Sequence, residues 1–571
     1  MTTVAVMGAS FQIGRSALAA YQAAIAAAGQ NIANVGNPDY ARQTARLAAL
    51  HGGLTPAGVS PGTGVEISAL RRHVDEALEA RLRWTMSQQR GAATRYDQLS
   101  QVESLYNELS GQDLSTRLTE LFGRFASLQT NPADGAARDT VLGAAQTLVR
   151  ELQRQRSGVR AQIDSLNAEV QSHVERANAI VGQIATLNGQ IVAAAARGAG
   201  GDSALRDRRD GLLRSLAELV DITTRPQDNG VVNVYIGSEP IVEYSRSRGL
   251  AVQRSIRDGV ERTDVRFADN GGRVLLTDGR LAALVQVRDG DLVSQLGKLD
   301  QLARALIYEV NRAHSSGCGL VGYTAITGTY PVSDRDAALN TPAAGLAFPV
   351  QNGTFRVVLR DANGVQTTTR LIEVDLDGLG ADTSLSTLAQ SLNAIDGLTA
   401  GVTVDGRLQV RADAGLELTF HDDTSGALAA LGVGTFFDGV DAATIEVNPA
   451  VLADRRLIAT SRSGAPGDGS NAGLLANAGS TASALLGGHG VQDFHDALTH
   501  ALAVQIAALQ DQADAADAIH ASLYAQREAV SGVSLDEEAV NLTMFERAFQ
   551  GASRYLSVVQ NLSQELLTIA G

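Results

Sequence analysis

The chain contains, at Ser531–Leu567, a stretch that reads SGVSLDEEAVNLTMFERAFQGASRYLSVVQNLSQELL. Ser534 is a typical N-cap residue, and Glu537 follows three positions later, where its carboxylate can reach back to the Ser534 backbone N–H as a capping box. Asp536, Glu537 and Glu538 place negative charge at the positive end of the helix dipole. The stretch therefore predicts a helix that begins near residue 535 and continues for about thirty residues, or roughly 45 Å.

This predicted helix carries one apolar stripe. Its members recur at steps of three and four, the spacing of one helical face; they are Leu542, Phe545, Phe549, Ala552, Leu556, Val559, Leu562, Leu566 and Ile569. A helix with such a stripe is not stable in water unless another surface covers it. An ordinary protein core could provide that surface, and so could a partner helix.

A second stripe lies near the N-terminus. Its members follow heptad-like spacing, and small residues between them permit close helix–helix approach; they are Phe11, Leu18, Tyr21, Ile25, Ala28 and Ile32. Gly36, Asn37 and Pro38 indicate that this helix ends near Asn34. We expect the two terminal helices to pack on each other, which would bring the termini together, or on neighbouring copies.

The pattern between these helices changes several times. Residues 39–70 are extended and turn-rich, and period-two alternation predicts strands from about 230 to 277. Helical periodicity predicts helices over 72–108, 115–128, 136–196, 202–222, 292–313 and 471–526. Residues 323–464 contain alternating apolar runs and the hairpin turn Asp405-Gly406, which predict a β-rich α+β insert.

The predicted fold is multidomain, mainly α and elongated, with both termini at one end and a β-rich α+β domain inserted. We assign residues 1–34 and 535–571 to a terminal coiled-coil domain. A helical middle domain takes 35–322 and 465–534, and an outer domain takes 323–464. The sequence leaves open whether the strands at 230–277 join the insert or the helical layer.

Composition excludes several classes of function. The 571 residues carry a net charge of −15, which argues against a nucleic-acid binder. No apolar run is long enough to cross a membrane, and Ser10, Gln12 and Arg15 interrupt any secretory signal. The single cysteine, Cys318, cannot form an internal disulfide.

No catalytic or cofactor-binding motif is found. His314 and Cys318 lie four residues apart, but no second pair follows at zinc-ligand spacing. Asp375 and Asp377 resemble a fragment of a calcium loop, yet the twelve-residue pattern does not continue. We therefore expect no enzymatic activity, no metal and no cofactor.

Motifs at both ends of the chain resemble those of a known family. GQNIAN at Gly29–Asn34, NPDYARQ at Asn37–Gln43 and GVSLDEEAVNLTMFERAFQGASRYL at Gly532–Leu556 resemble the terminal signatures of bacterial flagellar axial proteins, the rod, hook and junction subunits. The signature positions are Asn31, Asn34, Pro38, Tyr40, Arg42, Gln43, Asp536 and Glu537.

Further segments resemble the members of that family that join hook to filament. They are Tyr40–Thr44, Asn131-Pro132 with Arg138 and Val141-Leu142, Leu205–Leu213, and Leu299–His314. The chain departs from the family pattern at Cys318, Glu546 and Gly551, none of which belongs to the terminal stripes.

The resemblance implies a structural, extracellular flagellar protein that the flagellar type III apparatus exports without a cleaved signal. It implies a ring of about eleven copies with heterologous contacts, the hook protein below and the next junction protein above. A cytoplasmic export chaperone would cover the C-terminal helix, and neither nucleic acid nor membrane insertion is involved. The implied assembly interface comprises Leu18, Tyr21, Ile25, Ile32, Leu542, Phe545, Phe549, Leu556, Val559, Leu562 and Leu566.

Two alternatives remain open. The chain could be another axial protein, such as the third hook-associated protein or a hook subunit, although its length and the LRDRRD segment at Leu205–Asp210 argue against this. A secreted protein whose β-rich insert binds a ligand is the other alternative, but no residues within 323–464 converge on a site.

Overall fold

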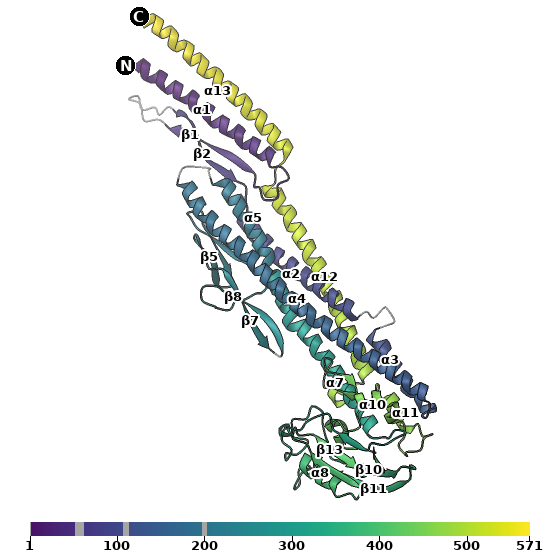
Figure 1. Ribbon diagram of the computed structural model, residues 1–571. Coiled ribbons are helices and arrows are strands. Elements are labelled where there is room, and N and C mark those ends of the chain that lie inside the picture. The colour runs from purple at the N-terminus through teal and green to yellow at the C-terminus, as the bar shows by residue number, and fades with distance from the viewer. Residues whose placement is uncertain (1, 52–61, 107–112, 197–201, 258, 571) are drawn as a thin grey trace. The chain divides into compact units, whose positions relative to one another are not determined.

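The computed structural model describes residues 2–51, 62–106, 113–196, 202–257 and 259–570, except for several side chains near both ends (Figure 1). It forms two compact units. Unit 1 comprises residues 1–98, 166–287 and 508–571, and unit 2 comprises 99–165 and 288–507. The prediction of a mainly α, multidomain fold with a strand-containing region in the middle is confirmed. The three-domain boundaries given above stay a prediction.

Unit 1 contains both terminal helices. Its helical segments are α1 (Thr2–Ala33), most of α2 (Glu76–Tyr106), the second part of α4 (Gly135–Ala195), α5 (Ser203–Leu219), α6 (Gly279–Gln286), the end of α12 (Val491–Ser531) and α13 (Leu535–Ala570). The long helices predicted at 136–196 and from residue 535 agree with α4 and α13 to within a residue or two. The short helix α6 was not predicted.

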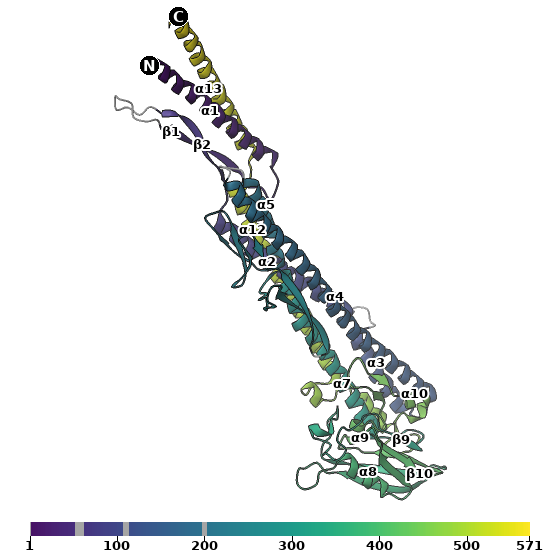
Figure 2. The ribbon, with the colours of Figure 1, turned by 60° about the vertical axis from the view of Figure 1, so that its left-hand side comes forward.

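Helices α1 and α13 pack side by side and antiparallel, as both ribbon views show (Figures 1 and 2). Gly14 of α1 lies directly against Leu556 of α13, because a β-carbon added at Gly14 would be only 2.6 Å from Leu556 Cδ1. The small residue thus permits close approach of the two helices.

A β-hairpin covers another face of α1. Strands β1 (Gln43–His51) and β2 (Gly62–Arg72) pair antiparallel, and the Val65 N–H donates to Ser16 Oγ of α1 at 3.2 Å. The fully covered side of α1 consists of small side chains, namely Ala20, Ala24, Ala27 and Ala28, together with Gly14 and Asn31. The predicted large-residue stripe is therefore not the most buried face of this helix.

Asparagines on α4 hold the remaining strands of unit 1. Strands β3 (Thr223–Pro226), β4 (Val232–Ile236), β5 (Glu239–Glu243) and β6 (Arg246–Ser247) form one sheet, and β7 (Leu250–Arg257) and β8 (Val260–Phe267) form a hairpin. The Asn178 side chain accepts from Leu250 N at 2.7 Å and donates to Leu250 O at 2.8 Å. Asn188 pairs in the same way with Val232, and Asn167 with β8. Each amide thus replaces a neighbouring strand, and these strands lie on α4 within unit 1.

Unit 2 combines helices with two three-stranded sheets and the short antiparallel pair β15 (Phe437–Asp438) and β16 (Glu446–Val447). Its helical segments are α3 (Leu114–Thr130), the first part of α4, α7 (Val293–Ser315), α8 (Leu385–Asn393), α9 (Ala427–Leu431), α10 (Pro449–Ala453), α11 (Ser470–Asn477) and the first part of α12, with the π-helical turn η1 (Val287–Leu292) before α7. One sheet has the order β11-β10-β14 (Gln366–Val374, Gly353–Asp361, Leu416–His421). The other has the order β12-β13-β9 (Leu398–Val402, Leu408–Ala412, Ala325–Thr327).

A fully buried arginine connects distant segments of unit 2. The Arg138 guanidinium donates to the carbonyls of Pro132, Arg455 and Ile458 and to Thr460 Oγ1, at 2.6–3.2 Å. Burial lowers the pKa of Arg138 to about 10. The segment of the sequence that carries Arg138 therefore has a structural role, because it joins the start of α4 to the chain after α10.

Candidate functional site at the terminal helices

The side of α1 that faces α13 carries the N-terminal stripe. Leu18, Tyr21 and Ile25 follow Gly14 at steps of four, three and four, so they lie on the same side of the helix as the residue that meets α13. Ile32 continues this side one heptad after Ile25. All four predicted side chains are half-buried rather than fully covered.

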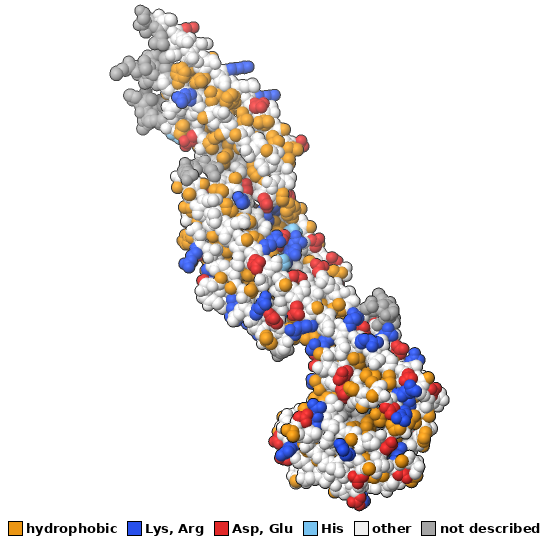
Figure 3. Space-filling view, viewed as in Figure 1, with side chains coloured by type: hydrophobic (Ala, Val, Ile, Leu, Met, Phe, Trp, Pro, Cys, Tyr) orange, Lys and Arg blue, Asp and Glu red, His pale blue; other side chains and the backbone are white. Residues whose placement is uncertain are grey.

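On α13 the predicted stripe divides into two groups. Leu542, Phe545, Phe549 and Leu556 are half-buried, and Val559 is buried. Leu562 differs, because 51% of its surface is exposed. The side chain of Leu566 lies outside the described residues. Among the described side chains of α13, only Glu538 and Val559 are buried, so one copy of the chain leaves most of this helix uncovered. Hydrophobic side chains are accordingly visible over the terminal helices at the upper end of Figure 3.

The signature residues gather where the terminal helices meet the rest of unit 1. Asn31, at the end of α1, is fully buried. Its side chain donates to Gln43 O at 2.8 Å and accepts from Gln43 N at 2.9 Å, and the Tyr40 hydroxyl donates to Asn31 Oδ1 at 2.7 Å. Burial, with Asp207 and Glu538 nearby, raises the pKa of Tyr40 to about 12, so the phenol remains a hydrogen-bond donor. Asn31 thus fixes the path of the chain from α1 into β1.

Arg42 connects the start of β1 to the start of α13. Its Nε donates to Glu538 Oε1 at 2.8 Å, and its Nη1 lies 2.8 Å from Glu537 Oε2. The Arg42 backbone N–H donates to Ser531 O at 2.9 Å. Glu538 is only 2% exposed, so this ion pair is stronger than one in open solvent.

The predicted capping box is wrong in one half. The Glu537 N–H does approach Ser534 Oγ, at 3.5 Å, as an N-cap requires. The Glu537 carboxylate, however, pairs with Arg42 instead of reaching back to the Ser534 N–H. The reason is a tertiary ion pair that competes with the local cap.

Two more arginines complete the same junction around Glu79 of α2. Arg214 of α5 donates to Glu79 Oε2 at 3.1 Å and to Asp39 Oδ1 at 2.7 Å. Arg527 of α12 donates to Glu79 Oε1 at 3.3 Å and to Tyr40 O at 3.4 Å. The junction therefore binds α2, α5, α12 and α13 to one loop.

The remaining signature residues lie at the rim of this junction. Asn34 donates through Nδ2 to Gln30 O at 2.9 Å, which stabilises the last turn of α1. Pro38 is exposed, but its carbonyl accepts from Arg214. Asp536 is exposed in the first turn of α13, where its charge favours the helix dipole.

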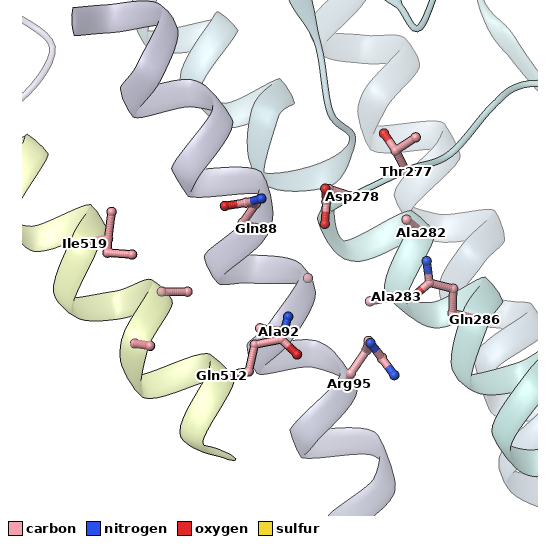
Figure 4. A pocket seen from close by; sticks show the side chains of 14 residues that line it. Gln88, Ala92, Arg95, Thr277, Asp278, Ala282, Ala283, Gln286, Gln512 and Ile519 are labelled. Atoms are coloured by element: carbon pink, nitrogen blue, oxygen red, sulfur yellow. The ribbon is translucent and has the colours of Figure 1, made fainter. Parts of the chain in front are cut away.

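A groove in unit 1 lies among α2, α6 and α12 (Figure 4). Its volume is about 370 Å³, and Gly91 and Ala92 of α2 contribute to its lining. Arg95, Asp278 and Gln512 also line it. Burial, together with Asp221, raises the pKa of Asp278. The lining offers hydrogen-bonding groups, among them Thr277, whose Oγ1 donates to Asp221 Oδ2 at 3.1 Å.

The residues considered for metal binding are otherwise engaged. His314 Nε2 accepts from Ala459 N at 3.0 Å, and Nδ1 donates to Gly434 O at 2.7 Å. Burial raises the pKa of the Cys318 thiol, which disfavours the thiolate that zinc requires. Asp375, Asp377 and Asp382 do approach one another, but Asp377 Oδ1 and Asp382 Oδ1 accept from backbone N–H groups of their own turn.

Comparison with known proteins agrees with this geometry. Residues 99–327 match the flagellar hook-associated protein FlgK helical domain, and residues 526–569 match the flagellar basal body rod FlgEFG protein C-terminal family. Flagellar hook-associated protein 1 of Salmonella typhimurium is 29% identical over 97% of this chain and 98% of its own. The Escherichia coli protein of the same name is 26% identical over the same shares.

A solved structure shares the fold. The flagellar hook junction protein FlgK from Burkholderia pseudomallei aligns with a TM-score of 0.50 and 16% identity, over 79% of this chain and all of that one. The architecture is thus that of a flagellar axial protein. Within that class, the chain resembles flagellar hook-associated protein 1 over nearly its whole length. These relatives are named as flagellar hook-associated proteins. Among the described helices, none combines the length and apolarity that crossing a membrane would need.

Proposed function

We propose that this chain is a structural subunit of the bacterial flagellum at the junction between hook and filament, and that it assembles through α1 and α13. The observation that carries the proposal is the incomplete covering of the terminal helices. Most of the described side chains of α13 are exposed in one copy, and a helix of this length needs an apolar partner surface. Neighbouring subunits would supply that surface.

The predicted interface residues contribute to this assembly in two ways. Leu18, Tyr21 and Ile25 would hold α1 against α13 within one copy, together with Ile32, Leu542, Phe545, Phe549, Leu556 and Val559. Leu562 would contact other subunits, and Leu566 stays a predicted interface residue. The signature residues around Arg42 and Asn31 would set the direction in which the terminal helices leave the rest of unit 1.

The resemblance to axial proteins supports a finer arrangement. A ring of about eleven copies would have hook protein on one side and the next junction protein on the other, through heterologous contacts. The flagellar type III apparatus would export the chain without a cleaved signal. A cytoplasmic chaperone would cover α13 before export, because an exposed apolar helix invites association.

Complementation tests this function. A flagellated strain that lacks its own hook-associated protein 1 is expected to make hooks without filaments, and the full chain should restore filaments. Removal of residues 542–571 should abolish that restoration. Restoration of normal filaments by the truncated chain would contradict the proposal.

A point substitution makes the test specific to the covered face of α13. Phe549→Asp places a charge against α1 and should prevent filament growth, since burying an unpaired carboxylate is costly. Gln550→Asp, at the adjacent exposed position, is the matched control and should leave filament growth unchanged.

A further inference from the structure

The groove among α2, α6 and α12 gathers polar side chains that have no partner within the described chain. Arg95 of α2 is half-buried, and its Nε is shielded from solvent and accepts no pairing from any described residue. The side-chain amides of Gln88, Gln286 and Gln512 also make no hydrogen bond to the described residues, and they enter the groove from three helices (Figure 4). Because a half-buried guanidinium is costly until its donors are paired, Arg95 favours an occupant that carries an acceptor.

Asp278 supplies the opposite charge on the facing side of this groove. It directly precedes α6, but its side chain makes no capping hydrogen bond. Its Oδ1 lies 3.8 Å from the position of a β-carbon added at Gly91, so the carboxylate is directed at α2. Burial and the nearby charge of Asp221 raise the pKa of Asp278, and no cation among the described residues offsets them. Asp278 therefore favours an occupant that carries a donor or a positive charge.

The spacing of these two charges limits the occupant. Asp278 faces Gly91, and Arg95 follows Gly91 by four residues, or about 6 Å along the helix axis. An α-amino acid carries its ammonium and carboxylate groups on one carbon atom, so it can contact both charges at this spacing. Charge-assisted hydrogen bonds of about 2.7–2.9 Å would join it to each side.

Small residues leave room for such a molecule. The groove has a volume of about 370 Å³, within the range of about 300–1,000 Å³ that is usual for small-molecule sites. A β-carbon added at Gly91 would lie only 3.3 Å from Gly279 N, so α2 and α6 are in direct contact and close the groove between them. The small members of the lining are Gly91, Ala92, Gly279, Ala282, Ala283, Ala515 and Ala516.

We propose that this groove binds a small α-amino acid, with the ligand carboxylate on Arg95 and the ligand ammonium group on Asp278. The amides of Gln88, Gln286 and Gln512 would contact the ligand side chain. All lining residues belong to unit 1, and none of them lies in α1 or α13. The site is therefore independent of the assembly surfaces described above.

Saturation-transfer NMR on the full-length chain tests the site, with L-glutamine and L-alanine as probes. We expect at least one of them to bind with a Kd below about 5 mM. The matched analogues each lack one charge: glutaramate and 4-aminobutanamide for glutamine, and propionate and ethylamine for alanine. Each analogue should bind at least about tenfold more weakly than its parent, since one charge-assisted contact is lost.

Charge variants locate the binding. Arg95→Gln and Asp278→Asn remove one charge each at similar side-chain size, and each should weaken binding at least about tenfold. Arg81→Gln and Asp97→Asn, at exposed positions of α2 outside the groove lining, are the matched controls. They should keep the affinity within about twofold, because isolated surface charges contribute little.

A steric variant keeps the test decisive if a charge variant does not fold. Ala515→Trp fills the groove from an exposed position of α12 and should abolish binding. Ala518→Trp, at an exposed position outside the lining, should leave binding unchanged.

Three results would overturn the inference. They are the failure of both amino acids to bind below about 5 mM, equal binding of the one-charge analogues, and binding that survives both Arg95→Gln and Ala515→Trp. Loss of filaments in an Arg95→Gln strain, without amino-acid binding to the wild-type chain, would also overturn it, since the groove would then receive a protein segment. Filament formation by the wild-type chain tests the proposed function separately from all of these results.

Discussion

The terminal helix pair and unit 2 differ in how completely their side chains are buried and paired within one copy of the chain. In unit 2, polar groups such as Arg138, Asn311 and His314 are at most 1% exposed, and each one pairs with backbone groups of the same unit. In the terminal pair, large apolar residues of α13 such as Val540 and Val558 remain more than half-exposed. These three groups of unit 2 find their partners within the unit, whereas α13 leaves large apolar side chains exposed.

This difference indicates where the chain is rigid and where it is adaptable. A buried polar network with every member paired specifies one structure, because any displacement leaves a group without a partner. A half-covered helix pair gains much less from its own packing, since the free energy depends on the apolar area removed from water. In this respect, the junction around Arg42 is intermediate between the paired polar network of unit 2 and the half-covered terminal helices.

The largest expected effect is in unit 2. Arg138→Ala removes the donors to three backbone carbonyls, two of them in buried hydrogen bonds, and should destabilise unit 2 by about 3–4 kcal/mol. Arg455→Ala removes a half-exposed ion pair with Asp139 and should cost less than about 1 kcal/mol. Native-state hydrogen exchange of unit 2 measures both. Equal effects would show that Arg138 does not hold this unit together.

Acid should weaken the same unit. Burial lowers the pKa of His314 from the usual 6.5 to about 4, and the nearby Arg138 charge acts in the same direction. The unfolded chain therefore binds a proton more readily than the folded one between these values. The stabilising contribution is complete above pH 6.5 and is lost as the pH falls, by about 3 kcal/mol at pH 4. Burial also lowers the pKa of His421, which adds to the effect.

Denaturant unfolding of unit 2 between pH 7 and pH 4 tests this dependence. His314→Gln should be less stable at pH 7 and show a flatter profile over that range, because the titrating group is gone. A wild-type profile that is flat from pH 6.5 to pH 4 would contradict the assigned neutral state of His314.

A smaller effect is expected at the junction. Arg42→Ala leaves the buried Glu538 carboxylate without its guanidinium partner. This should lower the stability of the first turns of α13 by about 2 kcal/mol. Asp536→Asn changes an exposed carboxylate of the same turn and should cost under about 0.5 kcal/mol. Amide exchange at residues 535–545 distinguishes the two variants. Equal exchange in both variants would show that the ion pair between Arg42 and Glu538 does not stabilise the start of α13.

The smallest effect has the opposite sign. Gly551→Ala should stabilise α13 of the free chain by about 0.5–1 kcal/mol, because alanine favours a helix and its β-carbon meets nothing. Gly14→Ala should gain less, since its β-carbon would force Leu556 to move. Circular dichroism during thermal unfolding compares the two variants. A destabilising Gly551→Ala would indicate a contact within one copy that the structure lacks.

Sequence patterns predicted the long elements well. The region 136–196 is nearly free of helix breakers, and α4 indeed runs from Gly135 to Ala195. The turn Asp405-Gly406 was predicted because glycine tolerates positive φ, and Gly406 adopts 79° between β12 and β13. Local chemistry is sufficient for such features.

Features that depend on distant partners could not be predicted in this way. Arg42 and Glu538 are 496 positions apart, so no local pattern indicates their ion pair or its competition with the Ser534 cap. The covered face of α1 is made of alanines, which carry little periodic signal beside Leu18 and Tyr21. In the sequence, Asn178 and Asn188 resemble ordinary residues on the surface of a helix. Only the structure shows that they bind the backbone of Leu250 and Val232.

The central claim is that the terminal helices become fully covered only when copies of the chain assemble. Hydrogen exchange on the free chain and on assembled flagella tests this claim most directly. Amides of residues 8–33 and 539–565 should exchange quickly in the free chain and become protected on assembly. Those of unit 2 should be equally protected in both states. Terminal helices that are as protected as unit 2 in the free chain would contradict the account, because their surface would then need no second copy.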